Sequence, residues 1–233
     1  MSYVTAIVLA AGKGERFKSK VPKPLVKIHS KPIIAYSLQA FSAHPSVKDI
    51  IVVVNAANRG AVIKIIERYR IDKISGIVKG GRRRQDSVKN GLKAVNPCSD
   101  VVLIHDSARP FINMQMVSSL IAAGQKHGAA IAAVPVKATI KVVSRSGKVQ
   151  ETLDRSRLWE IQTPQVFKKA LLLEAYKRFS KLDVTDDAGL VEKLGAHVAI
   201  VMGAYTNIKI TTPEDLAIAE VIAGKKTWDI KSA

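Results

Sequence analysis

The chain has 233 residues, of which 47% are hydrophobic, so it can form one large or two small folded domains and is not a disordered chain. No apolar run reaches the ~18 residues of a membrane span, and the start MSYVTAIVLAAG lacks the basic flank of a targeting peptide. The single cysteine, Cys98, cannot form an internal disulfide. We therefore expect a cytoplasmic protein that does not enter membranes. The net charge of +18 indicates either a polyanionic ligand or a lysine-rich surface that keeps the protein soluble, and the aromatic content of 5% disfavours nucleic acid.

Short apolar runs, rich in β-branched residues, alternate along the chain with amphipathic stretches of helical length. Several of these runs are apolar on both faces, as strands of a parallel sheet covered by helices must be. The strand-like runs are residues 5–10, 49–54, 74–79, 100–105, 129–136, 196–202 and 207–210. The helix-like stretches are residues 31–43, 59–70, 84–95 and 114–127. This alternation predicts a single α/β domain with a Rossmann-like, doubly wound and mostly parallel sheet.

The first run ends in a glycine turn that contains Gly12 and Gly14. A Walker A loop would need a second glycine five positions after Gly12, where Phe17 stands, and the dinucleotide pattern G-x-G-x-x-G fails at the same residue. The turn therefore belongs neither to a P-loop enzyme nor to a typical dehydrogenase. A glycine here still removes the Cβ atom that would keep a ligand away from the main chain.

Two cations follow this turn in a loop that prolines stiffen. Ala10 and Ala11 are small enough for a flat base to lie against the strand end. Arg16 offers a two-pronged group for phosphate oxygens and Lys23 a compact point charge. Together they could hold a triphosphate and stabilise the charge that develops in a transition state.

Residues 137–160 interrupt the alternation of strands and helices. TIKVV and KVQETL flank the sequence SRSG, which predicts a β-hairpin that turns at Gly147. Such an insertion is either a β-arm that packs on another subunit or a loop that covers its own domain.

The last helix has a clear start signal. Thr212 is expected to cap it, Pro213 suits its first position, and Asp215 stands three residues after the cap. No linker or repeat is visible, so we expect one domain over residues 1–224, including the arm, followed by a flexible tail over residues 225–233.

Several motifs together resemble the 2-C-methyl-D-erythritol 4-phosphate cytidylyltransferase family. The loop LAAGKGER with the later pair Pro22-Lys23 is similar to the wider class of sugar-nucleotide pyrophosphorylases. Five further motifs narrow the resemblance, which runs from about residue 4 to residue 222: GGRRRQDSV (80–88), HDSARPF (105–111), LDRSRLWEIQTPQVF (153–167), VTDDAGLVE (184–192) and NIKITTPEDL (207–216).

The resemblance implies an enzyme of the non-mevalonate isoprenoid pathway. It would transfer CMP from CTP to 2-C-methyl-D-erythritol 4-phosphate, giving 4-diphosphocytidyl-2-C-methyl-D-erythritol and pyrophosphate. The family's fold is a single Rossmann-like domain. The family also implies a homodimer in which each β-arm reaches the neighbouring subunit.

The same resemblance implies which residues bind CTP and which act in catalysis. Arg16 and Lys23 match the family's catalytic pair, and Gly81 and Ser87 would recognise the cytosine edge. A carboxylate beside phosphates implies a cation, so Asp106 would hold Mg²⁺ or another divalent ion, directly or through water, unless it only caps the next helix. The residues expected to bind CTP are Ala10, Ala11, Gly12, Gly14, Gly81, Ser87 and Asp106.

The second substrate is a branched polyol with one phosphate group. Hydroxyl side chains match its hydroxyl groups and cations match its phosphate. By resemblance, Thr139 and Arg155 would come from the arm of the other subunit. The remaining residues expected to bind this substrate are Arg109, Thr163, Thr185 and Lys209, although Arg109 could instead form an ion pair within its loop.

Two other functions remain open at this stage. Ribitol-5-phosphate cytidylyltransferase shares the glycine loop and the TPQ and NIK motifs, whereas LDRSRLW and TDDA favour the methylerythritol enzyme. A basic, non-catalytic nucleic-acid-binding protein would explain the net charge, but it would leave Asp106 and the glycine turn unexplained.

Overall fold

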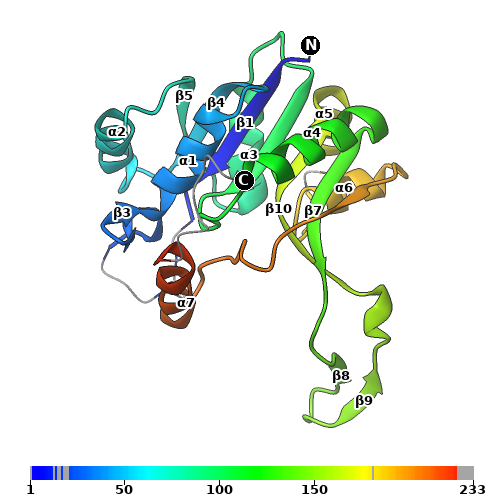
Figure 1. The fold of residues 1–233 in the computed structure, drawn as a ribbon. Coiled ribbons are helices and arrows are strands. Elements are labelled where there is room, and N and C mark those ends of the chain that lie inside the picture. The colour runs from blue at the N-terminus through cyan, green and yellow to red at the C-terminus, as the bar shows by residue number, and fades with distance from the viewer. Residues whose placement is uncertain (1, 13, 15–16, 18–20, 180, 225–233) are drawn as a thin grey trace.

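The computed structural model describes residues 2–12, 14, 17, 21–179 and 181–224. A seven-stranded sheet lies between two layers of helices, in the order β11-β7-β10-β6-β1-β4-β5 (Figure 1). Every strand runs parallel to its neighbours except β10, which is antiparallel to both β6 and β7. The predicted α/β class with a mostly parallel sheet is confirmed. Within the described part of the chain, no helix is long and apolar enough to cross a membrane.

The elements have the following bounds. The strands of the large sheet are β1 (Val4–Leu9), β4 (Val47–Val54), β5 (Ile74–Lys79), β6 (Val101–Asp106), β7 (Ala129–Pro135), β10 (Trp159–Lys168) and β11 (Ala199–Met202). The helices are α1 (Ile33–Ala43), α2 (Arg59–Arg68), α3 (Arg84–Lys93), α4 (Met114–His127), α5 (Lys169–Phe179), α6 (Ala188–Lys193) and α7 (Pro213–Gly224). The described residues also form two small hairpins, β2 (Lys27–Ile28) with β3 (Lys31–Pro32) and β8 (Lys141–Val143) with β9 (Val149–Thr152). The 3-10 turns with printed bounds are η2 (Lys23–Leu25) and η3 (Arg155–Arg157).

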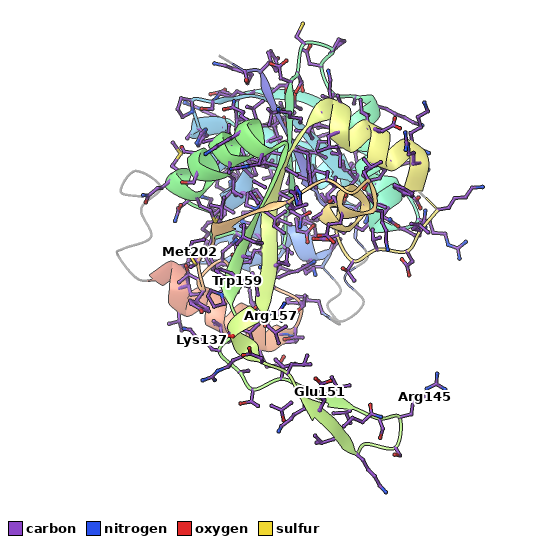
Figure 2. All side chains as sticks on the ribbon, turned by 90° about the vertical axis from the view of Figure 1, so that its right-hand side faces the viewer. Lys137, Arg145, Glu151, Arg157, Trp159 and Met202 are labelled. Carbon is purple, nitrogen blue, oxygen red and sulfur yellow. The ribbon has the colours of Figure 1, made fainter. Side chains whose placement is uncertain are left out.

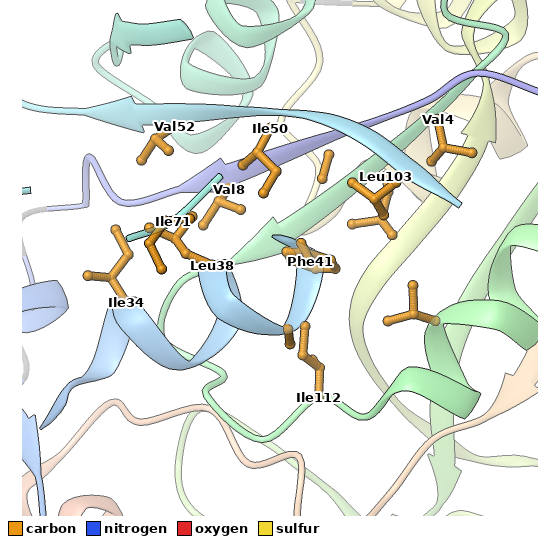
Figure 3. Close-up of a cluster of buried hydrophobic side chains, with 14 of the residues drawn as sticks. Val4, Val8, Ile34, Leu38, Phe41, Ile50, Val52, Ile71, Leu103 and Ile112 are labelled. Carbon is orange, nitrogen blue, oxygen red and sulfur yellow. The ribbon is translucent and has the colours of Figure 1, made fainter. Parts of the chain in front are cut away.

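The hydrophobic core has one large cluster on each face of the sheet. Side chains of α1, α2 and α4 cover one face, where Phe41, Leu38 and Leu103 are fully buried (Figure 3). Side chains of α3, α5 and α6 cover the other face. The strand runs are apolar on both faces because each face meets a helical layer.

The strand order reverses between β1 and β6. From β1 the chain continues to β4 and β5 on one side, and it then crosses to β6 on the other side. Leu9 and Asp106, the last residues of β1 and β6, are partners in the ladder. In open α/β sheets, ligands bind outside the carboxyl ends of the strands at such a point. The topology therefore predicts a binding site beyond Leu9 and Asp106.

The predicted hairpin in residues 137–160 is confirmed. Strands β8 and β9 form an arm that extends away from the body of the molecule below β7 and β10 (Figures 1 and 2). Gly147 lies at its tip with a φ of +78°, in the left-handed region that glycine adopts at no steric cost. Both arm strands are exposed along their whole length.

Some predicted boundaries need correction. Residues 207–210 form no strand, because Asn207 and Ile210 bond to the loop after β6 instead: the Arg109 guanidinium donates to the Asn207 carbonyl, and the Ile210 N–H donates to the Ala108 carbonyl. Helix α1 begins at Ile33 and not at residue 31, since Lys31 and Pro32 pair with β2.

The start of the last helix agrees with its sequence signal. Asp215 accepts hydrogen bonds from the Thr211 and Thr212 N–H groups at 2.7 and 2.8 Å, and Pro213 is the first residue of α7. The expected flexible tail, residues 225–233, lies outside the described residues.

Candidate active site

A cavity of about 1120 Å³ lies at the carboxyl ends of β1 and β6. It brings together several segments of the chain that are distant in sequence. Its walls contain all seven residues expected to bind CTP, together with Lys23 and Lys209. The other lining residues are Leu9, Pro24, Asn55, Ala56, Ala57, Lys79, Gly80, Arg82, Arg83, Arg84, Ser107 and Ala108.

The glycine turn lies directly against Lys23. Gly14 has a φ of +67°, and a Cβ atom built on it would come within 3.3 Å of the Lys23 Cβ atom. Gly12 has open space where a Cβ would stand, so a ligand can approach its main chain. Lys23 begins the turn η2, and Pro22 and Pro24 restrict the backbone on both sides of it. Arg16, the other expected catalytic cation, lies outside the described residues.

Two asparagines hold the end of β1 in place. Each of Asn55 and Asn58 accepts a hydrogen bond from the backbone N–H of the other, at 2.9–3.0 Å. Their amide groups then donate to the carbonyls of Ala11 and Ala10, at 3.2 and 2.8 Å. The sequence motifs do not include this pair, although two asparagines directly after a buried strand, at the edge where ligands bind, are a usable signal.

The loop between β5 and α3 packs closely on the first strand. A Cβ atom on Gly80 would come within 2.3 Å of the Ala11 Cβ, so only glycine lets these two segments meet. The Ser87 hydroxyl accepts from the Gly81 N–H at 3.1 Å and donates to the Arg83 carbonyl at 3.2 Å. Asp86 caps α3 by accepting from the Arg83 N–H at 3.0 Å. These bonds fix the Gly80–Gly81 segment in the cavity wall.

Asp106 ends β6 and carries the one carboxylate in the cavity lining described by the structure. Its Oδ1 accepts from Arg84 Nε at 3.1 Å, and its Oδ2 accepts from Lys209 Nζ at 2.6 Å. Burial alone would raise the pKa of Asp106, but the two adjacent cations outweigh burial and hold this pKa well below its usual range. The carboxylate is therefore ionised at neutral pH.

A chain of hydrogen bonds runs from the backbone of Asp106 to Thr163 and then to His105. The Thr163 Oγ1 accepts from the Asp106 N–H at 3.1 Å and lies 3.1 Å from His105 Nδ1. His105 Nε2 is 2.9 Å from the Arg109 carbonyl, which can only accept, so this nitrogen carries the proton. Burial lowers the pKa of His105 to about 4, which keeps the ring neutral. Thr163, which was expected to bind the polyol substrate, is buried and does not belong to the cavity lining.

The structure does not bring every predicted residue to this cavity. Arg109 is buried, and its guanidinium donates to the carbonyls of Asn207 at 2.7 Å and Ile161 at 3.3 Å, so it lies outside the lining. Thr139 and Arg155 are exposed on the arm, and Thr185 is exposed before α6. None of these four belongs to the cavity of its own chain.

The donor set limits what kind of metal site this cavity can offer. Among the residues that the structure describes, no group of three or more His, Cys, Asp or Glu side chains could hold a metal ion. A metal cage made only of protein ligands is therefore not found there. Mg²⁺ often binds through one or two carboxylates together with substrate phosphates, and Asp106 fits that requirement.

Comparisons with known proteins place these residues in a family context. The family model described as 2-C-methyl-D-erythritol 4-phosphate cytidylyltransferase matches residues 4–225. A curated relative of that name from Syntrophus aciditrophicus (strain SB) is 46% identical over 226 residues, covering 96% of this chain and 97% of the relative. The crystal structure of 4-diphosphocytidyl-2C-methyl-D-erythritol synthase from Anaerococcus prevotii DSM 20548 has a TM-score of 0.85 at 32% identity, and the match covers 96% of this chain and 97% of that one. The 2-C-methyl-D-erythritol 4-phosphate cytidylyltransferase from Thermus thermophilus has a TM-score of 0.77 at 31% identity, with 95% and 98% covered.

Proposed function

This chain belongs to the 2-C-methyl-D-erythritol 4-phosphate cytidylyltransferase family, and on that premise we propose how its residues perform the reaction. The enzyme transfers CMP from CTP to 2-C-methyl-D-erythritol 4-phosphate in isoprenoid biosynthesis. One observation supports the assignment of the site most directly. The glycine turn, Lys23 and Asp106 line one cavity at the point where the strand order of the sheet reverses.

CTP would lie with its base on the strand end and its phosphates over the glycine turn. Ala10 and Ala11 would leave room for the flat base, and the Gly81 backbone and the Ser87 hydroxyl, which both line the cavity, would meet its polar edge. Lys23 and Arg16 would bind the triphosphate and stabilise the charge that develops as a substrate phosphate oxygen attacks the innermost phosphorus of CTP. Phosphoryl-group transfer leaves little covalent work for side chains, so positioning and charge neutralisation carry the catalysis.

Asp106 is the residue that would hold Mg²⁺ or another divalent ion. When bound, such an ion neutralises charge on the phosphates. In the structure both oxygens of this carboxylate already accept hydrogen bonds from cations, Arg84 and Lys209. Lys209 is the more exposed of the two, with 38% of its side chain accessible, so its ammonium is the one better able to turn to the substrate phosphate.

The active enzyme would be a cytoplasmic homodimer that joins through the β-arm. The arm exposes Val142, Val143 and Val149, while Trp159 and Met202 are exposed where it leaves the body (Figure 2). Exposed apolar groups on a protruding hairpin are typical of a surface that a second subunit covers. Residues 1–224 would then form one domain whose arm carries substrate-binding groups to its partner.

Substrate identity can be tested by pyrophosphate release. With CTP and Mg²⁺, we expect rapid release with 2-C-methyl-D-erythritol 4-phosphate and little with ribitol 5-phosphate, because the pocket must match the hydroxyl groups of one polyol. Equal turnover of both, or preference for ribitol 5-phosphate, would contradict the proposed substrate. RNA binding that falls with salt, in the absence of any CTP turnover, would instead favour the nucleic-acid-binding alternative.

Mixing two inactive variants tests whether the arm works in trans. Lys23→Ala damages its own subunit's cavity, whereas Arg155→Ala would damage the cavity of the partner. After co-refolding in equal amounts, random pairing makes half of the dimers mixed, each with one intact site, so activity should recover to about one quarter of wild type.

The matched control for this experiment is a mixture of Lys23→Ala with Asp106→Asn. Both changes damage the cavity of the chain that carries them, so this mixture should stay inactive. If the Lys23→Ala and Arg155→Ala mixture also stays inactive, Arg155 serves its own subunit and the proposed role of the arm is wrong.

A further inference from the structure

We propose that Asp187, held by Tyr176, is a positioning residue for cytidylyl transfer: it fixes the Arg84 guanidinium in the cavity wall and, through Arg84, the carboxylate of Asp106. The inference rests on the proposed placement of CTP in this cavity. Neither Asp187 nor Tyr176 lines the cavity, so neither would touch a substrate there.

Asp187 is a fully buried carboxylate with two strong partners. Its Oδ2 accepts from Arg84 Nη1 at 2.7 Å, and its Oδ1 accepts from the Tyr176 hydroxyl at 2.5 Å. It stands at the N-cap position of α6, where an aspartate usually bonds to its own helix, yet its side chain makes no capping bond. Instead of capping its own helix, the Asp187 carboxylate therefore bonds to Arg84, which is 103 positions away in sequence.

Arg84 is shared between two carboxylates that come from different elements. It is the first residue of α3, it lines the cavity, and its Nε donates to Asp106 at 3.1 Å while Nη1 donates to Asp187. A guanidinium readily forms a two-pronged pair with a single carboxylate. By holding Nη1, Asp187 restrains the guanidinium in the orientation in which Nε meets Asp106 Oδ1.

Four groups are joined here by ion pairs, and their charges balance only when Asp187 is counted. Arg84 and Lys209 carry two positive charges, and Asp106 and Asp187 carry two negative ones. Burial lowers the pKa of Arg84, but the two carboxylates outweigh this and raise it, so the guanidinium stays charged. A buried ion pair costs desolvation energy that an apolar pair of similar volume would not. Because the Arg84–Asp187 pair lies against the cavity wall, we assign its desolvation cost to holding Arg84 in position for the reaction.

Kinetics of Asp187→Asn test the inference. The asparagine keeps the shape but turns an N–H donor or a neutral oxygen toward Arg84. Changes in residues that orient a functional group typically cost about 10- to 100-fold in affinity or activity, so we expect kcat/KM to fall by that factor with a rise in the KM for CTP. Tyr176→Phe should change both parameters in the same direction by less, and it decides the matter should Asp187→Asn fail to fold.

Matched controls lie near the amino-terminal ends of β1 and β4, whereas the cavity lies at the carboxyl ends of the strands. There the Tyr3 hydroxyl donates to the buried Asp49 carboxylate at 3.3 Å, so Asp49→Asn and Tyr3→Phe remove the same groups far from the cavity. Loss of folded protein lowers the apparent kcat and leaves KM unchanged, and this is the expected behaviour of the controls. An unchanged KM in both Asp187→Asn and Tyr176→Phe would overturn the inference.

A double variant separates positioning from general packing. In an Arg84→Met background, Asp187→Asn should cause no further rise in the KM for CTP, because the group that it positions is gone. Additive effects would contradict the inference. A wild-type enzyme that does not turn over CTP at all would refute the proposed function instead, so the two failures are distinguishable.

Discussion

Lys23→Ala is expected to lower kcat by about 100- to 1000-fold, the usual loss when one preorganised donor to a developing negative charge is removed. Lys23 has a fixed place because η2 begins with it, prolines flank it and Gly14 lies against it. The backbone that carries the ammonium is therefore already held beside the glycine turn. Single-turnover measurement of pyrophosphate release, with both substrates saturating, isolates this step from product release.

The control is Lys27→Ala, which removes an exposed lysine from β2, outside the cavity lining. It changes net charge equally and should leave kcat within about twofold, since remote surface charges have small effects. If Lys23→Ala keeps normal single-turnover rates, the triphosphate does not lie over the glycine turn.

Asp106→Asn is expected to lower kcat/KM by about 100- to 1000-fold, since charge stabilisation by a bound divalent ion is worth several kcal/mol. The substitution also leaves Arg84 and Lys209 without their shared carboxylate. The enzyme should then need a higher Mg²⁺ concentration for half-maximal rate, which a titration at fixed CTP measures. Mn²⁺ binding in the presence of CTP, followed by electron paramagnetic resonance, should weaken in parallel.

Asp72→Asn provides the comparison, because it removes one exposed carboxylate and does not touch the cavity. Its Mg²⁺ dependence should match that of wild type. Wild-type Mg²⁺ dependence in Asp106→Asn would show that this carboxylate does not hold the metal.

The sequence predicted those parts of the fold that local chemistry determines. Strands such as β1 and β4 are apolar on both faces, which is enough to identify buried parallel strands before any contact is known. The turn at Gly147 and the reciprocal bonds between the cap residue Thr212 and Asp215 are equally local. The cavity lining near the glycine turn also followed from sequence, because Ala10, Ala11 and Gly12 directly continue the first strand.

Elements whose character depends on distant partners were missed or misassigned. Strand β10 is exposed from Trp159 to Ile161, buried from Gln162 to Phe167 and exposed again at Lys168, so it has no single pattern along its length. Residues 207–210 look like a strand, but their backbone bonds to the loop that carries Arg109. The pairing of Arg84 with Asp187 spans 103 residues and leaves no local trace in either segment.

The antiparallel strand β10 connects the arm to the cavity region. At one end it continues from the arm, and farther along it carries Thr163, whose hydroxyl bonds to the backbone of Asp106. One strand therefore connects the base of the hairpin to a residue that bonds to the backbone of Asp106. If the hairpin packs on a second subunit as proposed, separation of the subunits would remove the partner's Arg155 from the cavity and would also free the strand end that leads to Thr163.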